Sequence, residues 1–139
     1  MKLKFKKLKP DAVTPSYAHE GDAGLDLYAL EDNELKPDEI KRIDFGFALE
    51  FPQGHVAIMK DRSSMGKNGI HNVGGVFDWG YRGEYNCTLI NLSGKNYTIK
   101  KGDKVTQMLI FPIAYAEIEE TNDLGDTSRS TGNFGSTGK

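Results

Sequence analysis

The arrangement of the apolar residues constrains the fold of this 139-residue chain more than any other feature. The apolar residues occur in short runs with strand character, and helical periodicity is scarce. Turn sequences such as Pro52-Gln53-Gly54 and Lys101-Gly102-Asp103 separate these runs. Many short strands at regular spacing are typical of an all-β sandwich or barrel and not of βαβ units. We therefore predict an all-β domain.

The predicted strands cover residues 2–8, 25–29, 42–51, 55–59, 75–78, 85–92 and 105–114. A single helical turn is predicted over residues 62–67. The basic N-terminus has no apolar core typical of a signal peptide, because lysines interrupt it throughout. Leu3 and Phe5 alternate with lysines, which favours a half-buried strand over a targeting or RNA-binding arm.

The formal net charge of −2 offers no overall field for nucleic acid, and no apolar run approaches the length of a membrane-spanning helix. We therefore expect neither nucleic-acid nor membrane partners. Cys87 is the only cysteine and lies in an apolar stretch, so we interpret it as a buried structural thiol rather than a nucleophile. A reducing cytoplasm is consistent with this cysteine usage.

The C-terminal segment has a different composition. After Glu120 the sequence is rich in Thr, Asn, Asp, Ser and Gly, and such a segment does not bury enough surface to fold alone. A disordered tail is one interpretation. Arg129 and Phe134, embedded among glycines and hydroxyls, support a closing arm instead, because arginine pairs with phosphate and an aromatic ring covers a base.

The first segment with chemical character runs from Gly75 to Glu84. Asp78 and Tyr81 flank Trp79-Gly80, and Gly80 suits the positive φ of a type II turn between two strands. A carboxylate beside an aromatic ring on a rigid hairpin suits a base and a sugar ring. An ordinary hairpin whose aspartate caps its own turn is the alternative.

Three further segments carry polar residues in positions suited to ligand binding. Arg62-Ser63-Ser64 at a helix start suits a phosphate, although a helix N-cap with a surface arginine is the simpler interpretation. Asp26 lies between two leucines of a strand and either holds a hydrated magnesium ion or faces bulk water. Gln107 in an apolar run is either a core hydrogen-bonding residue or a ligand contact.

Together and in this order, these segments resemble the trimeric dUTP pyrophosphatases (dUTPases) along nearly the whole chain. The matching motifs are Ala23-Gly24-Leu25-Asp26-Leu27, Arg62-Ser63-Ser64-Met65, Gly75-Val76-Phe77-Asp78 through Tyr81-Arg82-Gly83, Gly102-Asp103-Lys104-Val105-Thr106-Gln107, and Arg129 through Gly138. The last motif ends in Phe134-Gly135-Ser136-Thr137-Gly138, which is highly specific for the family.

The resemblance implies a jelly-roll-like (β-clip) domain over residues 1–120 and a flexible arm over residues 121–139 that closes over a neighbouring active site. It also implies a homotrimer with shared active sites and Mg²⁺-assisted hydrolysis of dUTP to dUMP and pyrophosphate. This reaction limits uracil in DNA and supplies dUMP for thymidylate synthesis. The implied location is the cytoplasm, or the host cytoplasm if the source is viral.

The resemblance also implies roles for individual residues. Asp78 is expected to be the general base that orients water against the α-phosphorus, Tyr81 to stack under deoxyribose, and Asp26 to contact magnesium through water. The residues expected to read the uracil edge are Asn72, Gly75, Val76 and Phe77. The residues expected to hold the phosphates are Arg62, Ser63, Ser64 and Gln107. The residues expected to bind substrate from a neighbouring arm are Arg129 at the γ-phosphate, Phe134 over uracil, Gly135 and Ser136.

The chain departs from the family pattern in a few places. Asp61 stands where the family often has proline, and its charge would weaken phosphate binding unless it points away. Ser130 and Asn133 stand where the arm usually has glycine. Trp79-Gly80 replaces a more usual acidic turn.

Two rival functions are considered. The turn is similar to that of the dCTP deaminases, which share the fold, but the glutamate expected at position 88 for deamination is Thr88 here. Deaminases also lack the Phe-Gly-Ser-Thr-Gly arm. A trimeric binding protein that keeps the pocket without turnover is the second rival, and Asp78 together with the complete arm argues for catalysis.

Overall fold

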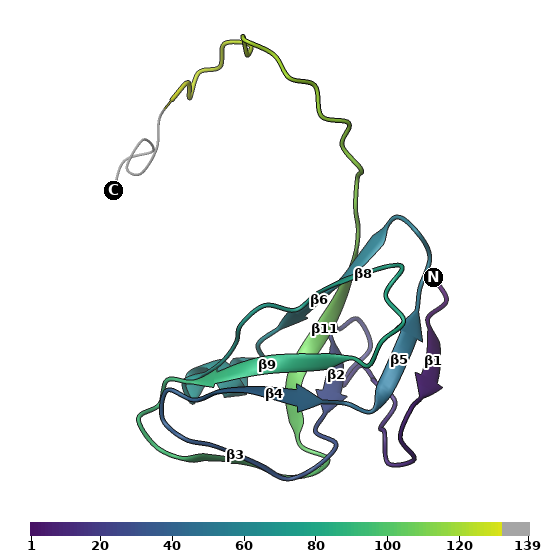
Figure 1. Cartoon of the computed structure of the whole chain (residues 1–139), viewed down its shortest axis with the longest axis vertical. Coiled ribbons are helices and arrows are strands. Elements are labelled where there is room, and N and C mark those ends of the chain that lie inside the picture. Colours follow the sequence, from purple (N-terminus) through teal and green to yellow (C-terminus); the bar gives the residue numbers. More distant parts are fainter. Residues whose placement is uncertain (132–139) are drawn as a thin grey trace.

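The computed structural model describes residues 1–131 of the chain. Eleven strands and one short helix follow one another in this part (Figure 1). In chain order they are β1 (Lys4–Lys7), β2 (Leu25–Tyr28), β3 (Asn33–Leu35), β4 (Ile40–Asp44), β5 (Phe47–Glu50), β6 (His55–Lys60), α1 (Ser63–Lys67), β7 (Ile70–Asn72), β8 (Val76–Asp78), β9 (Asn86–Asn91), β10 (Tyr97–Ile99) and β11 (Lys104–Pro112). The all-β prediction is confirmed.

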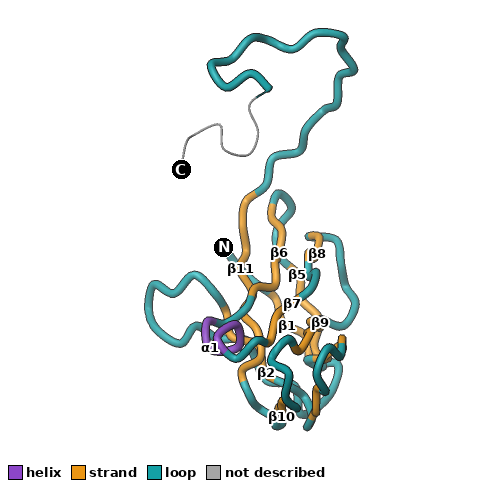
Figure 2. Tube along the Cα trace, turned by 90° about the vertical axis from the view of Figure 1, so that its left-hand side faces the viewer, coloured by secondary structure: helices purple, strands orange, loops and turns teal. Residues whose placement is uncertain are grey.

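The strands form two main sheets and two ribbons. One sheet has the order β2-β11-β6-β8 and the other the order β4-β9-β7, while β1 pairs with β5 and β3 with β10. All strand pairs in the described part are antiparallel. Figure 2 shows α1 at the side of the strand body, where it follows β6 and leads into β7. The helix therefore connects the two main sheets.

A single apolar core joins the sheets and ribbons. Leu27 and Met108 come from the four-stranded sheet, Leu89 from the three-stranded sheet, and all three are fully buried in the same cluster. Cys87 on β9 is buried in it too, and this burial raises the pKa of its thiol. The interpretation of Cys87 as a buried structural residue is confirmed, because a protonated thiol in an apolar core is a poor nucleophile.

The N-terminal strand matches its prediction. Phe5 of β1 packs against the core, whereas Lys4 and Lys6 on either side of it are exposed. This alternation is that of a strand with one face on the core and one in water. Lys4 also forms an exposed ion pair with Glu50 of the neighbouring strand.

The single strand predicted over residues 42–51 is wrong, because Gly46 divides it. Gly46 adopts a φ of +72° and its carbonyl accepts hydrogen bonds from the amides of Leu8 and Lys9. The chain thereby turns from the three-stranded sheet, which contains β4, to the ribbon formed by β1 and β5. Three strands were not predicted at all: β3, β7 and β10. Each has three residues, which is too short for an alternating pattern to stand out.

The hairpin predicted around Asp78 and Tyr81 is also wrong in two respects. β8 pairs with β6, whereas β9 pairs with β4 and β7, so the turn between them connects two sheets. The tight turn itself is present, since the Tyr81 amide donates to the Asp78 carbonyl at 3.0 Å. Gly80 has no positive φ, so the type II assignment fails. The turn is therefore a corner between the sheets.

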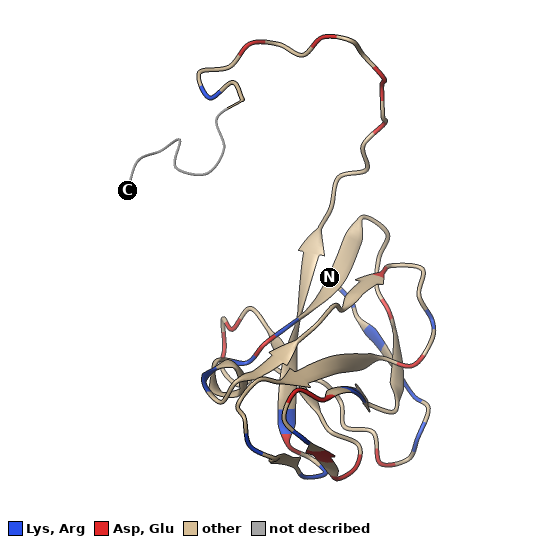
Figure 3. Cartoon of the chain, turned by 60° about the vertical axis from the view of Figure 1, so that its left-hand side comes forward, with Lys and Arg blue, Asp and Glu red and all other residues tan. Residues whose placement is uncertain are grey.

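The C-terminal part leaves the body at the end of β11. Residues 113–131 are exposed, contain neither helix nor strand, and extend away from the sheets (Figure 1). Figure 3 shows acidic residues, coloured red, along this stretch. Their positions are Glu117, Glu119, Glu120, Asp123 and Asp126. The domain boundary at residue 121 stays a prediction. Among residues 1–131, no helix has the length and apolar character needed to cross a membrane.

Candidate active site

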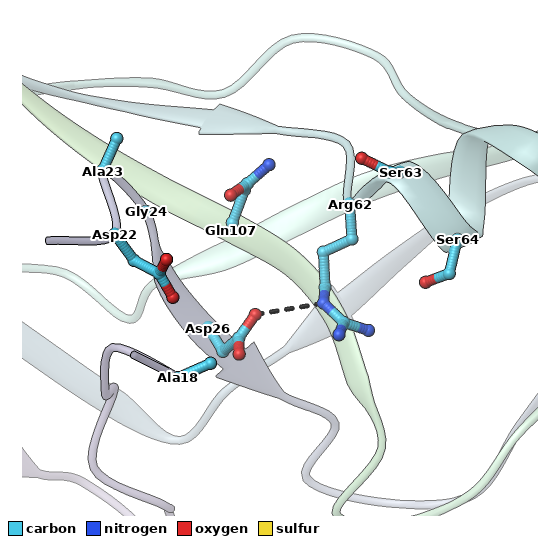
Figure 4. A pocket seen from close by; sticks show the side chains of 9 residues that line it. All are labelled: Ala18, Asp22, Ala23, Gly24, Asp26, Arg62, Ser63, Ser64 and Gln107. Atoms are coloured by element: carbon cyan, nitrogen blue, oxygen red, sulfur yellow. Dashed lines mark hydrogen bonds and ion pairs between the residues drawn. The ribbon is translucent and has the colours of Figure 1, made fainter. Parts of the chain in front are cut away.

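An open cleft of about 400 Å³ lies where β2, β11 and the start of α1 meet. The residues lining it are Ala18, Asp22, Ala23, Gly24, Asp26, Arg62, Ser63, Ser64 and Gln107. Figure 4 shows Gln107 between the Ala23-Gly24 stretch and Arg62, with the carboxylates of Asp22 and Asp26 beside it. The structure thus brings together Asp26, Arg62, Ser63, Ser64 and Gln107, which are five of the predicted site residues.

Asp26 lies at the centre of the charge network in this cleft. It is 8% exposed and its strand register places it opposite Gln107. One carboxylate oxygen accepts from Arg62 Nε at 3.0 Å, and the other pairs with Lys104 Nζ at 2.7 Å. The hydrogen bond that Lys104 donates to Asp26 raises the pKa of Lys104. The possibility that Asp26 faces bulk water is therefore wrong, because two cations neutralise a largely buried carboxylate.

Arg62 is held in a defined orientation at the wall of the cleft. Besides its bond to Asp26, its Nη1 donates to the Lys104 carbonyl at 2.9 Å. The simple N-cap interpretation is wrong, since Arg62 itself occupies the N-cap position without a side-chain cap bond. The hydroxyls of Ser63 and Ser64 are exposed and have no hydrogen-bond partner within residues 1–131. They remain available to a ligand in the cleft.

Gln107 is fixed from two sides. Its Nε2 donates to the Asp61 carbonyl at 2.8 Å. A Cβ atom at position 24 would lie 2.3 Å from Gln107 Oε1, so Gly24 leaves the space in which this amide lies. The close approach explains why glycine follows Ala23 here. Gln107 is half-buried and lines the cleft, so it both forms an internal hydrogen bond and faces the space for a ligand. Both interpretations of Gln107 from the sequence, a core hydrogen-bonding residue and a ligand contact, therefore remain.

The corner turn presents a second cluster. Asp78 is exposed, and within the described part of the chain its carboxylate has no hydrogen bond or ion pair. The aspartate therefore does not cap its own turn. Tyr81 is 38% exposed, its hydroxyl donates to the Glu84 carbonyl at 3.1 Å, and its ring centroid lies 5.5 Å from that of Phe77. The turn thus holds a free carboxylate beside a braced aromatic ring.

The segment of residues 72–77 leads into this turn from β7. Gly75 has a φ of +97°, and a Cβ there would lie 2.7 Å from Met59 Cβ, so only glycine is accommodated. The Asn72 amide group donates to the Gly74 carbonyl at 3.1 Å. Asn72 Oδ1 is buried and has no partner among residues 1–131. A buried unpaired acceptor is costly, so it favours a ligand or a second chain at this position.

The two clusters are separated within one chain. On β6, Val56 lies opposite Asp78 and Lys60 lies opposite Gln107. These positions are four residues apart along one strand, which corresponds to roughly 13 Å. Asp78 and Tyr81 therefore do not line the cleft that contains Arg62 and Gln107.

Three neighbouring residues were not predicted as parts of the site. Asp22 lines the cleft, Lys104 neutralises Asp26, and Asp61 contacts Gln107. Lys104 lies inside one of the motifs quoted above and Asp22 directly precedes another. The residue type alone did not indicate a role for either. The Asp61 carboxylate points away from the cleft: one oxygen accepts from the Asn72 backbone amide at 2.6 Å and the other contacts Nδ1 of His71.

The predicted residues of the C-terminal arm are only partly described. Arg129 lies in the exposed stretch that follows β11, and Ser130 adopts a φ of +43°. A positive φ suits glycine better than serine, which matches the position where the family usually has glycine. Asn133, Phe134, Gly135 and Ser136 lie outside the described residues.

Residues 1–131 contain no group of three or more His, Cys, Asp or Glu side chains arranged to hold a metal ion. A metal cage built entirely from protein is therefore not present in this part. Asp22 and Asp26 nevertheless face one cleft, and Mg²⁺ in nucleotide sites typically uses one or two carboxylates together with water and substrate phosphates. The residues present fit a hydrated ion of this kind.

Comparison with known proteins gives a consistent result. A family model for dUTPase matches residues 11–138. The deoxyuridine 5'-triphosphate nucleotidohydrolase of Clostridium tetani is 44% identical over 140 residues, which cover 99% of this chain and 97% of the relative.

Solved structures share the fold. A mutant dUTPase of Staphylococcus bacteriophage 80alpha with dUpNHpp has a TM-score of 0.93 at 24% identity, and the match covers 99% of both chains. A mutant dUTPase from phage phi11 of S. aureus, described with a structural Mg(II) ion, has a TM-score of 0.84 at 24% identity over 91% of this chain and all of that chain. The match to the family model over nearly the whole sequence and the 44% identity to a full-length relative show that the chain belongs to the dUTPase family.

Proposed function

We propose that the protein hydrolyses dUTP to dUMP and pyrophosphate by attack of water on the α-phosphorus. The observation that carries this proposal is the combination of a cleft lined by an oriented arginine and two hydroxyls with an unpaired carboxylate beside an aromatic ring, in a chain of the dUTPase family. The cleft suits a triphosphate, and the corner turn suits a sugar and a base. The reaction removes dUTP, which limits uracil in DNA, and supplies dUMP for thymidylate synthesis.

The cleft residues bind the phosphates in this proposal. Arg62 is oriented by Asp26 and the Lys104 carbonyl, so its remaining guanidinium N–H groups are directed without further ordering of the side chain. The hydroxyls of Ser63 and Ser64 and the amide of Gln107 add neutral hydrogen bonds. A preoriented set of donors loses little conformational entropy when the ligand binds.

The corner turn and the segment before it bind the nucleoside. Backbone groups of Asn72, Gly75, Val76 and Phe77 read the uracil edge, and the unpaired Asn72 Oδ1 supports a polar contact there. The Tyr81 ring stacks under deoxyribose. Crowding at the turn excludes the methyl group of thymine.

Asp78 acts as the general base. Its carboxylate is exposed and unpaired within residues 1–131, so it is free to accept a proton from water and to orient that water against the α-phosphorus. The main-chain hydrogen bond from Tyr81 to Asp78 holds the turn rigid.

Asp26, with Asp22 beside it in the cleft, would hold a hydrated Mg²⁺ through water. When bound, this ion neutralises part of the triphosphate charge and orients the α-phosphate. Asp26 also keeps its bonds to Arg62 and Lys104, because each carboxylate oxygen can accept more than one hydrogen bond.

The active site is shared between chains of a homotrimer in this proposal. The distance of roughly 13 Å along β6 between the positions facing Asp78 and Gln107 supports sharing, because a second chain would supply the missing half. The arm of a neighbouring chain closes the site, with Arg129 at the γ-phosphate, Phe134 over uracil, and Gly135 and Ser136 around the substrate. Because the single cysteine is a buried thiol, we also propose a cytoplasmic location, or the host cytoplasm for a viral source.

Deamination of dCTP is not favoured. Thr88 occupies the position where that reaction requires glutamate, and its carbonyl accepts a hydrogen bond from the Val73 amide at 2.8 Å. A threonine hydroxyl does not replace a carboxylate as a proton-transfer group at neutral pH. Incubation with magnesium and dCTP tests the alternative, and release of ammonia would favour it.

The Asp78→Asn variant tests the proposed function. We expect it to bind a non-hydrolysable dUTP analogue as the wild type does while its kcat falls about 100-fold or more, the scale of a lost general base. Pyrophosphate release from dUTP with magnesium measures the turnover. The matched control is Asp11→Asn, which removes an exposed carboxylate that is paired with Lys101 outside both clusters. Unchanged kcat in Asp78→Asn would remove Asp78 from its role.

A further inference from the structure

Asp61 connects the cleft of its chain with the base-reading segment (residues 72–77) of the same chain, although it lies in neither. It follows β6 directly and precedes Arg62. Its backbone carbonyl accepts a hydrogen bond from Gln107 Nε2 at 2.8 Å, and its side-chain Oδ1 accepts one from the backbone amide of Asn72 at 2.6 Å. Its other carboxylate oxygen pairs with His71. One residue thus contacts the cleft through its backbone and the base-reading segment through its side chain.

These contacts cross between separate sheets. Gln107 belongs to β11 in the four-stranded sheet, whereas His71 and Asn72 belong to β7 in the three-stranded sheet. The Asp61 side chain is 23% exposed, so its bond to the Asn72 amide is partly shielded from water. A charge-assisted hydrogen bond in such a place is stronger than a neutral bond at the surface. The bond therefore holds the end of β7 against the end of β6.

The end of β7 matters because it begins the segment that faces the base. The side-chain amide of Asn72 donates a hydrogen bond to the Gly74 carbonyl, and Gly75 packs tightly on Met59. A shift of the Asn72 backbone is therefore passed on to residues 74 and 75. Since binding sites lose affinity when their groups move by fractions of an ångström, the placement of Asn72 affects which base is accepted.

We propose that Asp61 is a positioning residue that fixes the base-reading segment against the end of β6 and thereby contributes to the selectivity for uracil. This inference rests on the proposed function. The charge of Asp61 is not expected to weaken phosphate binding, because its carboxylate contacts Asn72 and His71 on the side away from the phosphates. A proline here would stiffen the backbone by its ring, whereas Asp61 does so by hydrogen bonding.

The test compares Asp61→Ala with Asp61→Asn. Alanine removes the acceptor of the Asn72 amide, so we expect the KM for dUTP to rise about tenfold, the scale of one lost hydrogen bond, while kcat stays within about threefold. We expect the ratio of kcat/KM for dUTP over dTTP to fall by about tenfold as well. Asparagine retains an acceptor oxygen, so it restores KM and selectivity to within about threefold of the wild type.

Two further measurements separate positioning from general damage. Hydrogen exchange of the Asn72 amide should lose protection in Asp61→Ala and keep it in Asp61→Asn. The matched control is Asp32→Ala, because Asp32 also accepts from a backbone amide, that of Lys101 at 2.8 Å, and pairs with Lys100 outside the cleft. This control removes an acceptor of a backbone amide away from the cleft and should leave selectivity unchanged.

The inference is overturned if Asp61→Ala keeps the wild-type selectivity and KM, or if Asp32→Ala lowers selectivity equally. Equal losses in the alanine and asparagine variants would also overturn it, since the acceptor would then not matter. Failure of the proposed function gives a different result, because the wild type itself would then not hydrolyse dUTP.

Discussion

Tyr85 illustrates how a residue outside the site supports it. The side chain is completely buried, and its ring stacks on Phe77 with centroids 4.5 Å apart and planes at 16°. Phe77 in turn contacts Tyr81, so the proposed sugar platform rests on an aromatic stack. The Tyr85 hydroxyl is buried without a partner among residues 1–131, and burial raises the pKa of Tyr85 to about 12.

At the residue scale, this burial predicts a dependence of stability on high pH. The folded pKa of Tyr85 lies above the value of about 10 for an unfolded tyrosine, so this group leaves the free energy of unfolding unchanged below pH 10 and lowers it as the pH rises through about 12. Tyr85→Phe should lack this loss. The variant also removes an unpaired buried hydroxyl. Its free energy of unfolding at pH 7 should therefore lie between the wild-type value and a value about 1 kcal/mol higher.

Urea unfolding at pH 7, 10 and 11, at one protein concentration, measures both effects, and other titrating groups cancel in the difference between the two proteins. If Tyr85→Phe were clearly less stable at pH 7, the hydroxyl would have a partner in the assembled protein.

At the element scale, Gly46 decides where one predicted strand becomes two. It is buried, and a Cβ there would lie 3.0 Å from Leu30 Cδ1 and 3.2 Å from the Cβ atoms of Ala12 and Lys9. Its φ of +72° directs β5 away from β4 and toward β1. This bend lets β5 contribute Phe47 to the stack with Tyr85.

Substitution of Gly46 by alanine should therefore combine backbone strain with overpacking. Gly54→Ala is the matched control, because Gly54 has a similar φ of +81° and nothing within 4 Å of the added Cβ. We expect the control to lower the free energy of unfolding by about 1–2 kcal/mol through strain alone. Gly46→Ala should lower it by about 2–4 kcal/mol, since overpacking adds to the strain. Urea unfolding measures both, and equal losses would show that the neighbours of Gly46 relax freely.

At the scale of the whole molecule, the main feature is the separation of the phosphate cleft from the corner turn. Arg62 and Gln107 line the cleft, whereas Asp78 of β8 lies outside it, opposite Val56 of β6. A shared site in a closed trimer would combine the cleft of one chain with the turn of another. The exposed stretch after β11 then reaches beyond its own body, as Figure 1 shows for residues 113–131.

Mixing two inactive variants tests sharing directly. Asp78→Asn chains keep an intact cleft and Arg62→Ala chains keep an intact turn. After unfolding and refolding together, a random one-to-one mixture should contain wild-type halves in about a quarter of its sites. We therefore expect about a quarter of the wild-type kcat from the mixture and almost none from either variant refolded alone. Absence of recovery in a mixture that forms mixed trimers would show that each site uses one chain.

The fold class could be predicted because period-two alternation and turn residues are local signals. Phe5 between two lysines is one example, and the prediction of an exposed face and a core face for β1 is confirmed there. The three-residue strands β3, β7 and β10 could not be predicted, since their pairing partners rather than their own sequences define them. The same holds for Gly46 and Gly80, because their φ angles follow from the sheets that they connect.

By itself, the sequence determined the all-β class, the buried thiol of Cys87 and the motifs that identify the family, since these depend on residue types and their order. Only the tertiary structure decided that Asp26 is neutralised by two cations, that Asp61 bonds to Asn72, and that Asp78 lies apart from Arg62. The reason is physical: these are contacts and separations between residues from different strands, and they depend on strand register and sheet pairing, which no local pattern specifies.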